Sequence, residues 1–539
     1  MFSYTIEQLP GNRPTIWERL PLQPLAPGPL QAFSYSVLAE VLGRAWYHYY
    51  DQLGFTPPLR TRLLRKYKGW AYLNLSESAR LEATHAGIEP LTLRINGAAY
   101  PLADWEKPGL MASLKTGRVQ KKMRQTRAAQ IEEFQAVRTK ARNWHTKTRE
   151  MKWSQAEILQ VMEEIERVNL NSLVTYFAIR HNLELAYNRL LNLTQARLPY
   201  PANLFTINNA VCDVDGLVEN AMATALVEMA QLVGTDAATV DWLRQPDLHN
   251  WREELPHVGL RAAMDEFLSI YGHRCADEGE LSTPRWFEDP TPVLRGVLAC
   301  LQKTPKHIAV MPSAQNVAKV LDAVGEKQKA DAQTLLQTIR DLLWAQSHAL
   351  DAVAFFLAGT RQWALAAGQE ALRDARLAEL DDVFHFELEE IKQMMTGEWN
   401  ISSQAEIRAT AIQRREEFLQ LNSIPPADLL LGDEEAINTT VGLPGTAGQV
   451  TGPLRRWDVP QPHICNGAVV GVNHLDSGWS LLLPIARGLI TATGTPLDPV
   501  VAAARQWHTP TILDLGAQYA DLIEGAETTV DVEQVLVDQ

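Results

Sequence analysis

The chain has 539 residues, of which 46% are hydrophobic and 21% are charged, and its formal net charge at pH 7 is −14. At roughly 150 residues per domain, this length predicts three or four domains, and the composition excludes a disordered or fibrous protein. The excess of acids argues against a general nucleic-acid-binding protein, because such proteins neutralise phosphates with surplus Lys and Arg.

The cysteines and the N-terminus indicate the compartment. The four cysteines are scattered without CxxC spacing, so neither a disulfide framework nor a zinc knuckle is predicted, and a reducing, cytoplasmic location fits best. The N-terminus lacks a charged start followed by an apolar core, and the longest apolar runs are far shorter than the ~20 residues of a membrane span. We expect neither export nor a membrane span.

The first part of the chain differs in amino-acid composition from the later parts. Residues 1–110 are rich in Pro, Tyr and Trp, which predicts little regular helix and a short strand within 69–78. The aromatic run 45–55 is typical of core packing, with an apolar substrate pocket as the alternative. Between 112 and 200, apolar residues recur at spacings of three and four, which predicts long helices with Ser154 as an N-cap.

One segment reverses the acidic character of the chain. Between Lys115 and Lys152 there are twelve Lys or Arg and three Glu, a local charge of +9 that leaves −23 on the other residues. Such a run is typical of a solvated helix face. The functional alternative is a docking surface for an acidic partner.

More helices are predicted toward the middle of the chain. Periodicity indicates helices at 215–234 and 258–271, a charged, proline-rich loop at 272–292, and further helices across 312–377. The segment 329–380 is long enough for two antiparallel helices, and its excess of Ala, Leu, Gln and Arg supports helix.

The C-terminal region has a different pattern. Prolines and acids at 422–435 predict a linker, after which short β-rich runs such as GAVVGVN and RGLITATG alternate with glycine turns and one helix. This pattern predicts a compact β/α domain of about 100 residues.

Three segments of this C-terminal region resemble, in order, the swivelling phosphohistidine domain of the phosphoenolpyruvate-utilising enzymes. This is the family of phosphoenolpyruvate synthase, pyruvate phosphate dikinase and rifampicin phosphotransferase. GLPGTAGQVTGPLRRW (442–457) is similar to the opening strands, residues 467–491 to the central strands with their D-x-G-W turn, and residues 508–537 to the closing segment.

The resemblance continues upstream, in the rifampicin-phosphotransferase branch. YGHRCADEGELSTPRWFEDP (271–290) is similar to a G-H-R-x-x-x-E-x-D/E-L-x-x-P-R-W motif of the helical domain. LDDVFHFELEEI (380–391) resembles the D-x-F-x-L-x-x-E-E segment, and GWAYLNLS resembles an early G-x-x-Y-x-N. His385 lies where the family commonly has an aromatic residue, and we interpret it as structural.

The resemblance implies an α+β multidomain fold, with a large, mainly helical domain followed by a C-terminal swivelling β/β/α phosphohistidine-like domain. The predicted domains are an N-terminal mixed segment packed on the helical domain, a helical acceptor-binding-like domain, a linker and the swivelling domain, at 1–110, 111–421, 422–437 and 438–539.

Two parts of the family's machinery have no counterpart in this sequence. One is the ATP-grasp domain, which no Gly-rich phosphate loop replaces. The other is the reactive histidine of the G-G-x-x-S-H-A-A-I-V-A-R motif, because alignment through Arg505 places Asp498 and Pro499 at the Ser-His pair. A phosphohistidine relay needs a ring nitrogen as nucleophile, which proline lacks. His474 and His508 lie in the same region but do not align with the reactive position.

Asp498 and Pro499 nevertheless favour a helix start. Aspartate caps free N–H groups, and proline at the first helical position loses nothing by lacking its own. The resemblance also makes Asp498 and Arg505 candidates for residues near a phosphate, with the carboxylate of Asp498 standing in for the anion or, as a less favoured alternative, carrying the phosphoryl group itself.

The charged loop at 272–292 holds the densest group of candidate ligand-binding residues: His273, Arg274, Glu278, Glu280 and Arg285. These side chains suit an anionic or hydroxylated ligand. The alternative is a network of buried ion pairs and hydrogen bonds that pins a long loop to the helices. Their spacing is not that of a standard metal site, so we expect no metal and no cofactor.

Together these features favour a degenerate member of the family, a substrate-binding or regulatory subunit without its own phosphohistidine relay. The alternative is the acceptor-binding subunit of a split ATP-dependent phosphotransferase or condensing enzyme. Its partner would then be a separate ATP-grasp protein, with the small-molecule ligand unknown and neither nucleic acid nor membrane involved.

Overall fold

In a computed structural model, the chain divides into two compact units. Each unit is made of segments that are not consecutive in the sequence. The structure describes residues 3–9, 13–58, 61–308, 313–397, 404–421, 426–439 and 442–539, and side chains within 166–172 are not described. The first unit comprises Met1–His181, Glu278–Ser282 and Ala349–Thr440. The second comprises Asn182–Asp277, Thr283–His348 and Val441–Gln539. The successive domains expected from the sequence stay a prediction. The mixture of helices and two sheets agrees with an α+β protein.

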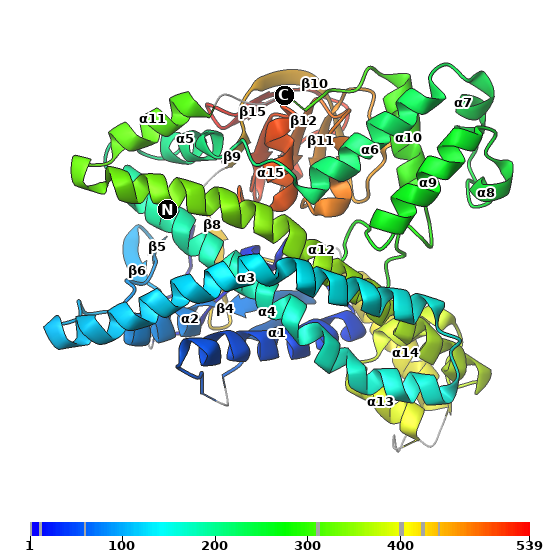
Figure 1. Cartoon of the computed structure of the whole chain (residues 1–539), viewed down its shortest axis with the longest axis horizontal. Helices are drawn as coiled ribbons and strands as arrows, with labels where there is room; N and C mark the ends of the chain where they lie inside the picture. The colour runs from blue at the N-terminus through cyan, green and yellow to red at the C-terminus, as the bar shows by residue number, and fades with distance from the viewer. Residues whose placement is uncertain are drawn as a thin grey trace. The chain divides into compact units, whose positions relative to one another are not determined.

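The first unit combines long helices with an eight-stranded sheet (Figure 1). Its helices are α1 (Ala32–Leu53), α2 (Leu75–Leu81), α3 (Leu110–Glu150), α13 (Leu388–Thr396) and α14 (Gln404–Leu421), with parts of α4 (Gln155–Thr194) and α12 (Lys329–Arg373). Short helical turns are η1 (Leu20–Leu22), η2 (Glu82–Ala86) and η4 (Leu380–His385). The strands follow the order β3-β4-β2-β7-β8-β1-β5-β6. Their bounds are β1 Ser3–Thr5, β2 Ile16–Glu18, β3 Leu64–Tyr67, β4 Trp70–Asn74, β5 Thr92–Ile95, β6 Ala98–Pro101, β7 Leu429–Leu431 and β8 Glu434–Asn438.

The second unit packs helices against a seven-stranded sheet, with α15 against β9 (Figure 1). Its helical segments are α5 (Ala202–Ala210), α6 (Val218–Val233), α7 (Ala237–Leu243), α8 (Trp251–Glu254), α9 (Val258–Tyr271), α10 (Thr291–Gln302), α11 (Ala314–Ala323), η3 (Glu326–Gln328), η5 (Pro462–Ile464), η6 (Ser477–Leu482), α15 (Pro499–Gln506) and α16 (Gln518–Asp521). The strands follow the order β15-β14-β10-β11-β12-β13-β9. Their bounds are β9 Leu443–Thr446, β10 Gln449–Trp457, β11 Val469–Val472, β12 Gly488–Thr491, β13 Thr511–Leu513, β14 Glu527–Asp531 and β15 Leu536–Asp538.

The four central strands of the second sheet, β10 to β13, pair in parallel, and β9, β14 and β15 pair antiparallel at its edges. Alternate residues of these strands form one core, which includes Leu454, Val469, Ile490 and Ile512. The expected β-rich runs are confirmed as the strands β11 and β12 of this sheet, and the separate β/α domain stays a prediction.

The prediction of little helix within 1–110 is wrong, because α1 has 22 residues. Its buried positions recur every three or four residues, so the bulky aromatic side chains lie on the core side of the helix. Trp46 and Tyr50 are buried and bind Ser78 Oγ and Glu82 Oε1 at 3.1 and 3.0 Å. These contacts agree with core packing of the aromatic run. The predicted strand within 69–78 is confirmed as β4.

The prediction of two antiparallel helices within 329–380 is also wrong, because α12 is one helix of 45 residues. Neither Gly359 nor Gly368 interrupts α12. Each of them allows a neighbouring segment to pack close to the helix. A Cβ on Gly359 would lie 2.5 Å from Trp144 Nε1, and a Cβ on Gly368 would lie 3.1 Å from a side-chain atom of Leu380. The most apolar 18-residue window of this helix is 89% buried, as in the core helix of a globular protein.

Ser154 precedes α4 and its backbone carbonyl accepts from Ile158 N at 3.0 Å, which confirms the predicted helix start. The linker predicted over 422–437 contributes instead, in its described part, β7 and β8 to the first sheet. β7 pairs with β2 and β8 pairs with β1. Pairing with strands more than 400 residues away leaves no local signal in the sequence.

Candidate functional site

The resemblance described above predicts the family's reactive residue at the start of α15. Asp498 is the N-cap and Pro499 the first helical residue, as predicted. The Asp498 carbonyl accepts from Val501 N and Ala502 N, each at 3.0 Å. The predicted side-chain cap is wrong, because the Asp498 carboxylate does not bind the N–H groups of the helix. Its two oxygens accept instead from Thr495 N at 2.9 Å and Thr495 Oγ1 at 2.8 Å.

Arg505 ties the same helix to the turn before it. Its Nε donates to Gly445 O at 3.0 Å and an Nη donates to Pro496 O. Burial lowers the pKa of the guanidinium, and the carboxylate of Asp498 opposes this shift. Asp498 and Arg505 are both 1% exposed, so the two charges that we expected near a phosphate lie inside the unit.

His273 and Arg274 lie in the second unit, in the turn that follows α9, and are buried. An Nη of Arg274 lies 4.0 Å from Oε1 of Glu219, which is on α6 and has no exposed surface. Glu219 also accepts from Ser477 Oγ at 2.6 Å and from Ser347 Oγ. The arginine of the predicted motif therefore lies beside a buried carboxylate that two hydroxyl groups already satisfy.

The turn around Asp476, the D-S-G-W segment, lies against this same loop. Asp476 accepts from Asp277 N and from Gly478 N, the latter at 2.8 Å. A Cβ on Gly478 would lie 2.4 Å from Ala276 Cα, so glycine is needed for this close approach. Burial raises the pKa of Asp476 to about 6, while the backbone N–H groups and the charge of Arg274 lower it. Two segments with separate family resemblances thus form one buried polar cluster in the second unit.

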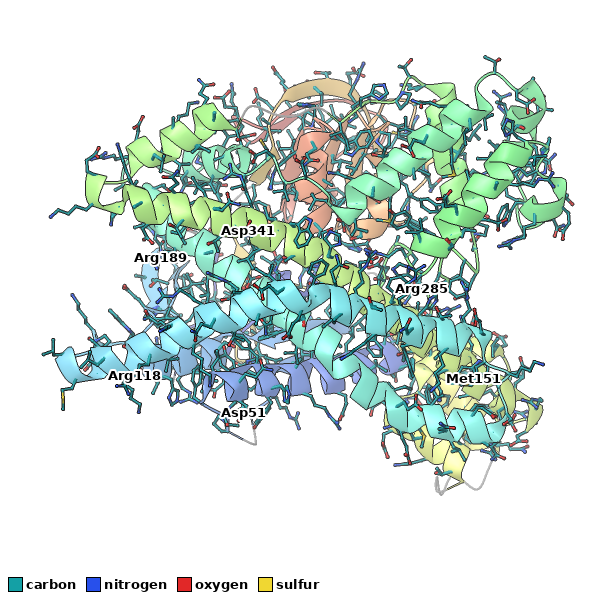
Figure 2. The ribbon with its side chains drawn as sticks, in the orientation of Figure 1. Asp51, Arg118, Met151, Arg189, Arg285 and Asp341 are labelled. Carbon is teal, nitrogen blue, oxygen red and sulfur yellow. The ribbon has the colours of Figure 1, made fainter. Side chains whose placement is uncertain are left out.

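Arg285 contacts other residues of the same loop, 272–292. One Nη donates to Cys275 Sγ at 2.7 Å and lies 3.4 Å from Thr283 O (Figure 2 labels this arginine). The adjacent Trp286 N donates to Arg274 O at 2.9 Å, and its ring lies 5.9 Å from that of Phe267. The buried Trp286 ring therefore packs as an apolar part of the loop.

Glu278 and Glu280 belong to the first unit, and both are buried. Glu280 accepts from Gln31 N at 2.8 Å, from Ser34 Oγ at 2.8 Å and from Ser282 N at 2.9 Å. Gln31 is the N-cap of α1, so the carboxylate lies where the helix dipole favours negative charge.

The five loop candidates are therefore divided between the two units, three in the second and two in the first. Arg274, Glu280 and Arg285 have protein partners, as in the buried network that was one of the two interpretations of the loop. Ligand contact by these residues stays a proposal. In the described part of the chain, no group of three or more His, Cys, Asp and Glu side chains is arranged to hold a metal ion.

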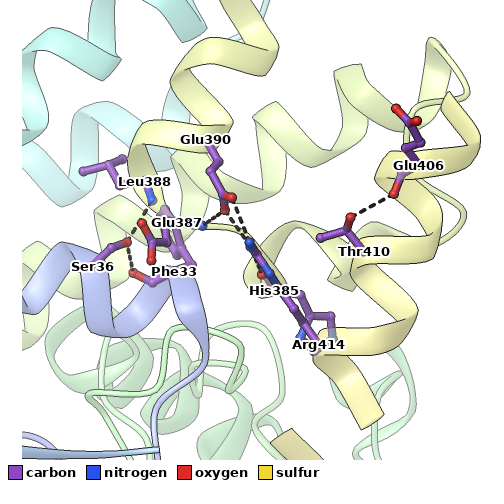
Figure 3. Close-up of polar contacts among 9 residues, drawn as sticks. All are labelled: Phe33, Ser36, His385, Glu387, Leu388, Glu390, Glu406, Thr410 and Arg414. Carbon is purple, nitrogen blue, oxygen red and sulfur yellow. Dashed lines mark hydrogen bonds and ion pairs between the residues drawn. The ribbon is translucent and has the colours of Figure 1, made fainter. Parts of the chain in front are cut away.

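The segment 380–391 forms a second polar cluster, in the first unit (Figure 3). Arg414 binds Glu390 through two contacts of 2.6 and 2.8 Å and donates to His385 O at 3.0 Å. Burial lowers the pKa of His385, and the nearby charge of Arg415 adds to this effect. These contacts agree with a structural role for His385.

Comparisons with known proteins agree with the resemblance found in these motifs. Residues 173–364 match the model of the rifampicin phosphotransferase fourth domain. This match supports membership of the phosphoenolpyruvate-utilising enzyme family. It is 24% identical over 328 residues to a rifampicin phosphotransferase of Streptomyces sviceus and 20% identical over 324 residues to one of Bacillus subtilis. Each match covers 55% of this chain and 37% of the relative, so the chain spans little more than a third of these relatives' length.

Sequence reasoning did not identify Glu219, Ser347 and Ser477, which complete the cluster around Arg274. Asp476 lay in a quoted motif but had no assigned partner. Ser347 and Ser477 are 130 residues apart in sequence, and no local pattern links either to a glutamate on α6.

Proposed function

We propose that this protein is a degenerate relative of rifampicin phosphotransferase that binds a substrate or regulates a partner and has no phosphohistidine relay of its own. The observation that carries the proposal is the start of α15. Proline occupies the position expected for the nucleophile, and the carboxylate of Asp498 is bound to Thr495. A proline nitrogen within the chain has no lone pair available for phosphoryl transfer, so this helix start keeps its shape without the chemistry.

In this proposal the β9–β15 sheet is the family's swivelling domain in a docked position. Trp507 Nε1 donates to Asn220 Oδ1 at 3.1 Å and Gln346 Nε2 donates to Leu497 O at 3.0 Å, so buried contacts join the neighbourhood of α15 to α6 and α12 within one unit. Buried polar contacts of this kind are costly to open, because each group would need a new partner. They support a domain that stays docked, which suits binding better than a relay between distant sites.

The proposed ligand contacts in the second unit are His273, Arg274 and Arg285, with Asp498 and Arg505 near any phosphate. Glu278 and Glu280 are separate candidates in the first unit. The burial of these side chains supports the assignment, because charged groups held away from water interact strongly with a ligand of opposite charge. His273→Ala should then weaken ligand binding, while Arg456→Ala, an exposed arginine on β10, should leave it unchanged.

Radiolabelled ATP and phosphoenolpyruvate test the loss of the relay. We expect neither to label the purified protein on histidine. Stable, stoichiometric labelling that maps to His474 or His508 would contradict the proposal, since these are the other histidines considered in this region. A thermal-shift screen with phosphorylated and aromatic compounds tests binding, because a ligand that binds the folded state raises the melting temperature. If no compound does so, the protein is a scaffold.

A specific observation favours the second candidate function, an acceptor-binding subunit that works with a separate ATP-grasp protein. The surface of α3 carries seven exposed cations with no carboxylate in ion-pair distance within the described part of the chain: Lys115, Arg118, Lys121, Lys122, Arg124, Lys140 and Arg142 (Figure 2 labels Arg118). Leu110, Met111 and Leu114 at the start of the helix are 88%, 85% and 69% exposed. An exposed apolar end beside unpaired cations suits an acidic protein surface.

Co-expression with an ATP-grasp protein encoded nearby tests this candidate. The complex should show ligand-dependent ATP turnover that His273→Ala abolishes. Arg118→Glu combined with Lys122→Glu should weaken association at low salt, and the effect should diminish as salt is added. Charge reversal at Arg455, an exposed arginine of the second unit, is the matched control. Equal association of all variants would contradict docking through α3.

A further inference from the structure

Lys306 is a half-buried lysine with unusual surroundings in the second unit. It lies in the segment after α10, where its backbone N donates to Pro484 O at 2.8 Å. Its amine donates to the hydroxyl of Thr509, which is fully buried. Among the described residues, no carboxylate lies within ion-pair distance of this amine. A lysine held in this way has a neutral partner and no counter-charge.

Loss of hydration favours the neutral form of such an amine. Burial lowers the pKa of Lys306 to about 7, and the thiol of Cys465 opposes the shift. About half of the Lys306 side chains are then unprotonated at pH 7, against fewer than about one in a thousand for an ordinary lysine. An unprotonated amine with its lone pair available is a nucleophile.

A second lysine, Lys303, lies near Cys465 as well. The amine of Lys303 is so close to Gly467 that a Cβ there would lie 2.1 Å from Nζ. Lys303 and Lys306 both act electrostatically on Cys465, whose sulfur also interacts with the backbone N–H groups of Gly467 and Ala468. Lys303 is exposed, and no described carboxylate neutralises it. Lys303 and Lys306 therefore both lie close to Cys465, one exposed and the other half-buried.

We propose that Lys306 is a reactive amine that forms an imine with a small aldehyde or ketone carrying an anionic group, and that Lys303 holds the anionic group. In the reaction, the Nζ lone pair forms a bond to the carbonyl carbon. The carbonyl oxygen leaves as water with the two protons that the neutral amine gives up, so no oxidant or further reactant is needed. Thr509 positions the amine through its hydroxyl. This assignment is independent of the function proposed above.

Labelling of the whole protein with pyridoxal 5′-phosphate, an anionic aldehyde, tests the proposal. After incubation at pH 7 and reduction with borohydride, peptide mapping should find Lys306 modified at least about tenfold faster than the exposed Lys121 and Lys122. The rate at Lys306 should rise with pH to a plateau with a midpoint near 7. Labelling of Lys306 no faster than that of these two exposed lysines would overturn the proposal. This comparison needs no variant, so a folding defect cannot obscure it.

A substituted protein separates the two roles. Lys303→Met should slow the modification of Lys306 by pyridoxal 5′-phosphate several-fold and leave its modification by butanal, which has no charge, unchanged. Lys327→Met, an exposed lysine on η3, is the matched control and should change neither rate. Equal rates for the two aldehydes in wild-type and Lys303→Met proteins would overturn the role of Lys303. Circular dichroism melting of each variant verifies that it is folded.

Discussion

The Asp498 carboxylate binds Thr495 through both of its oxygens, accepting from the backbone N–H at 2.9 Å and from the hydroxyl at 2.8 Å. The carboxylate therefore closes the turn that leads into α15, while the backbone carbonyl of the same residue begins the helix. An aspartate engaged in this way is a structural element of the loop, and its charge is held beside Arg505 inside the unit.

Asp498→Asn should destabilise the protein by about 1–3 kcal/mol, because the amide replaces one acceptor by a donor next to the Thr495 N–H or hydroxyl. Denaturant unfolding followed by circular dichroism measures the change. Asp236→Asn at the start of α7 is the matched control, since its carboxylate there binds the Thr239 hydroxyl and the residue is only half-buried. Equal losses in the two variants would contradict a special role for the Asp498–Thr495 pair.

Asp476 should make stability depend on pH. Folding raises the pKa of Asp476 from 3.8 to about 6, so the folded state binds the proton more tightly than the unfolded state does. Its contribution to the free energy of unfolding is complete below about pH 4 and falls by about 2–3 kcal/mol as the pH rises through 6. Asp476→Asn removes the titration, so the stability difference between wild-type and variant should fall over this range. If the difference in free energy of unfolding between wild-type and variant is constant, or grows with pH, the raised pKa of Asp476 is contradicted.

Gly359→Ala should destabilise the first unit by about 1–3 kcal/mol, since overpacking a tight contact forces side chains or backbone to move. The new Cβ would lie 2.5 Å from Trp144 Nε1 and 2.9 Å from Thr148 Oγ1. Gly43→Ala within α1 is the control, because nothing lies within 4 Å of a Cβ there and alanine favours helix by about 0.5–1 kcal/mol. The melting temperature should fall for Gly359→Ala and rise for Gly43→Ala. A higher melting temperature for Gly359→Ala would contradict the close packing of α12 at this glycine.

Glu280→Gln should lower the free energy of unfolding by about 1.5–3 kcal/mol, because hydrogen bonds to a charged acceptor are the stronger ones. The carboxylate accepts from three groups, two of them on or beside the first turn of α1. Glu40→Gln on the exposed side of the same helix should cost much less, because its ion pair with Arg44 is solvated. If Glu280→Gln keeps full stability but loses ligand binding, Glu280 is a ligand contact and not an anchor of the loop.

Much of the molecule could be predicted from local signals. The periodicity between 112 and 200 predicted α3 and α4, and the runs GAVVGVN and RGLITATG predicted two central strands of the second sheet. α1 was missed because its aromatic residues are weak helix formers whose stability comes from burial, and burial depends on distant partners. The length of α12 was misjudged because its glycines pack against other helices instead of ending it.

The sequence by itself determined that α15 begins at Pro499 with Asp498 as its N-cap, since the preference of proline for the first helical position is a property of residue type. Only the tertiary structure decided what the side chains do: Thr495 binds the carboxylate of Asp498, Glu219 lies beside Arg274, and the loop around His273 is shared between two units. The physical reason is that helix starts depend on neighbours in the chain, whereas the partner of a buried charge depends on which distant segments fold around it.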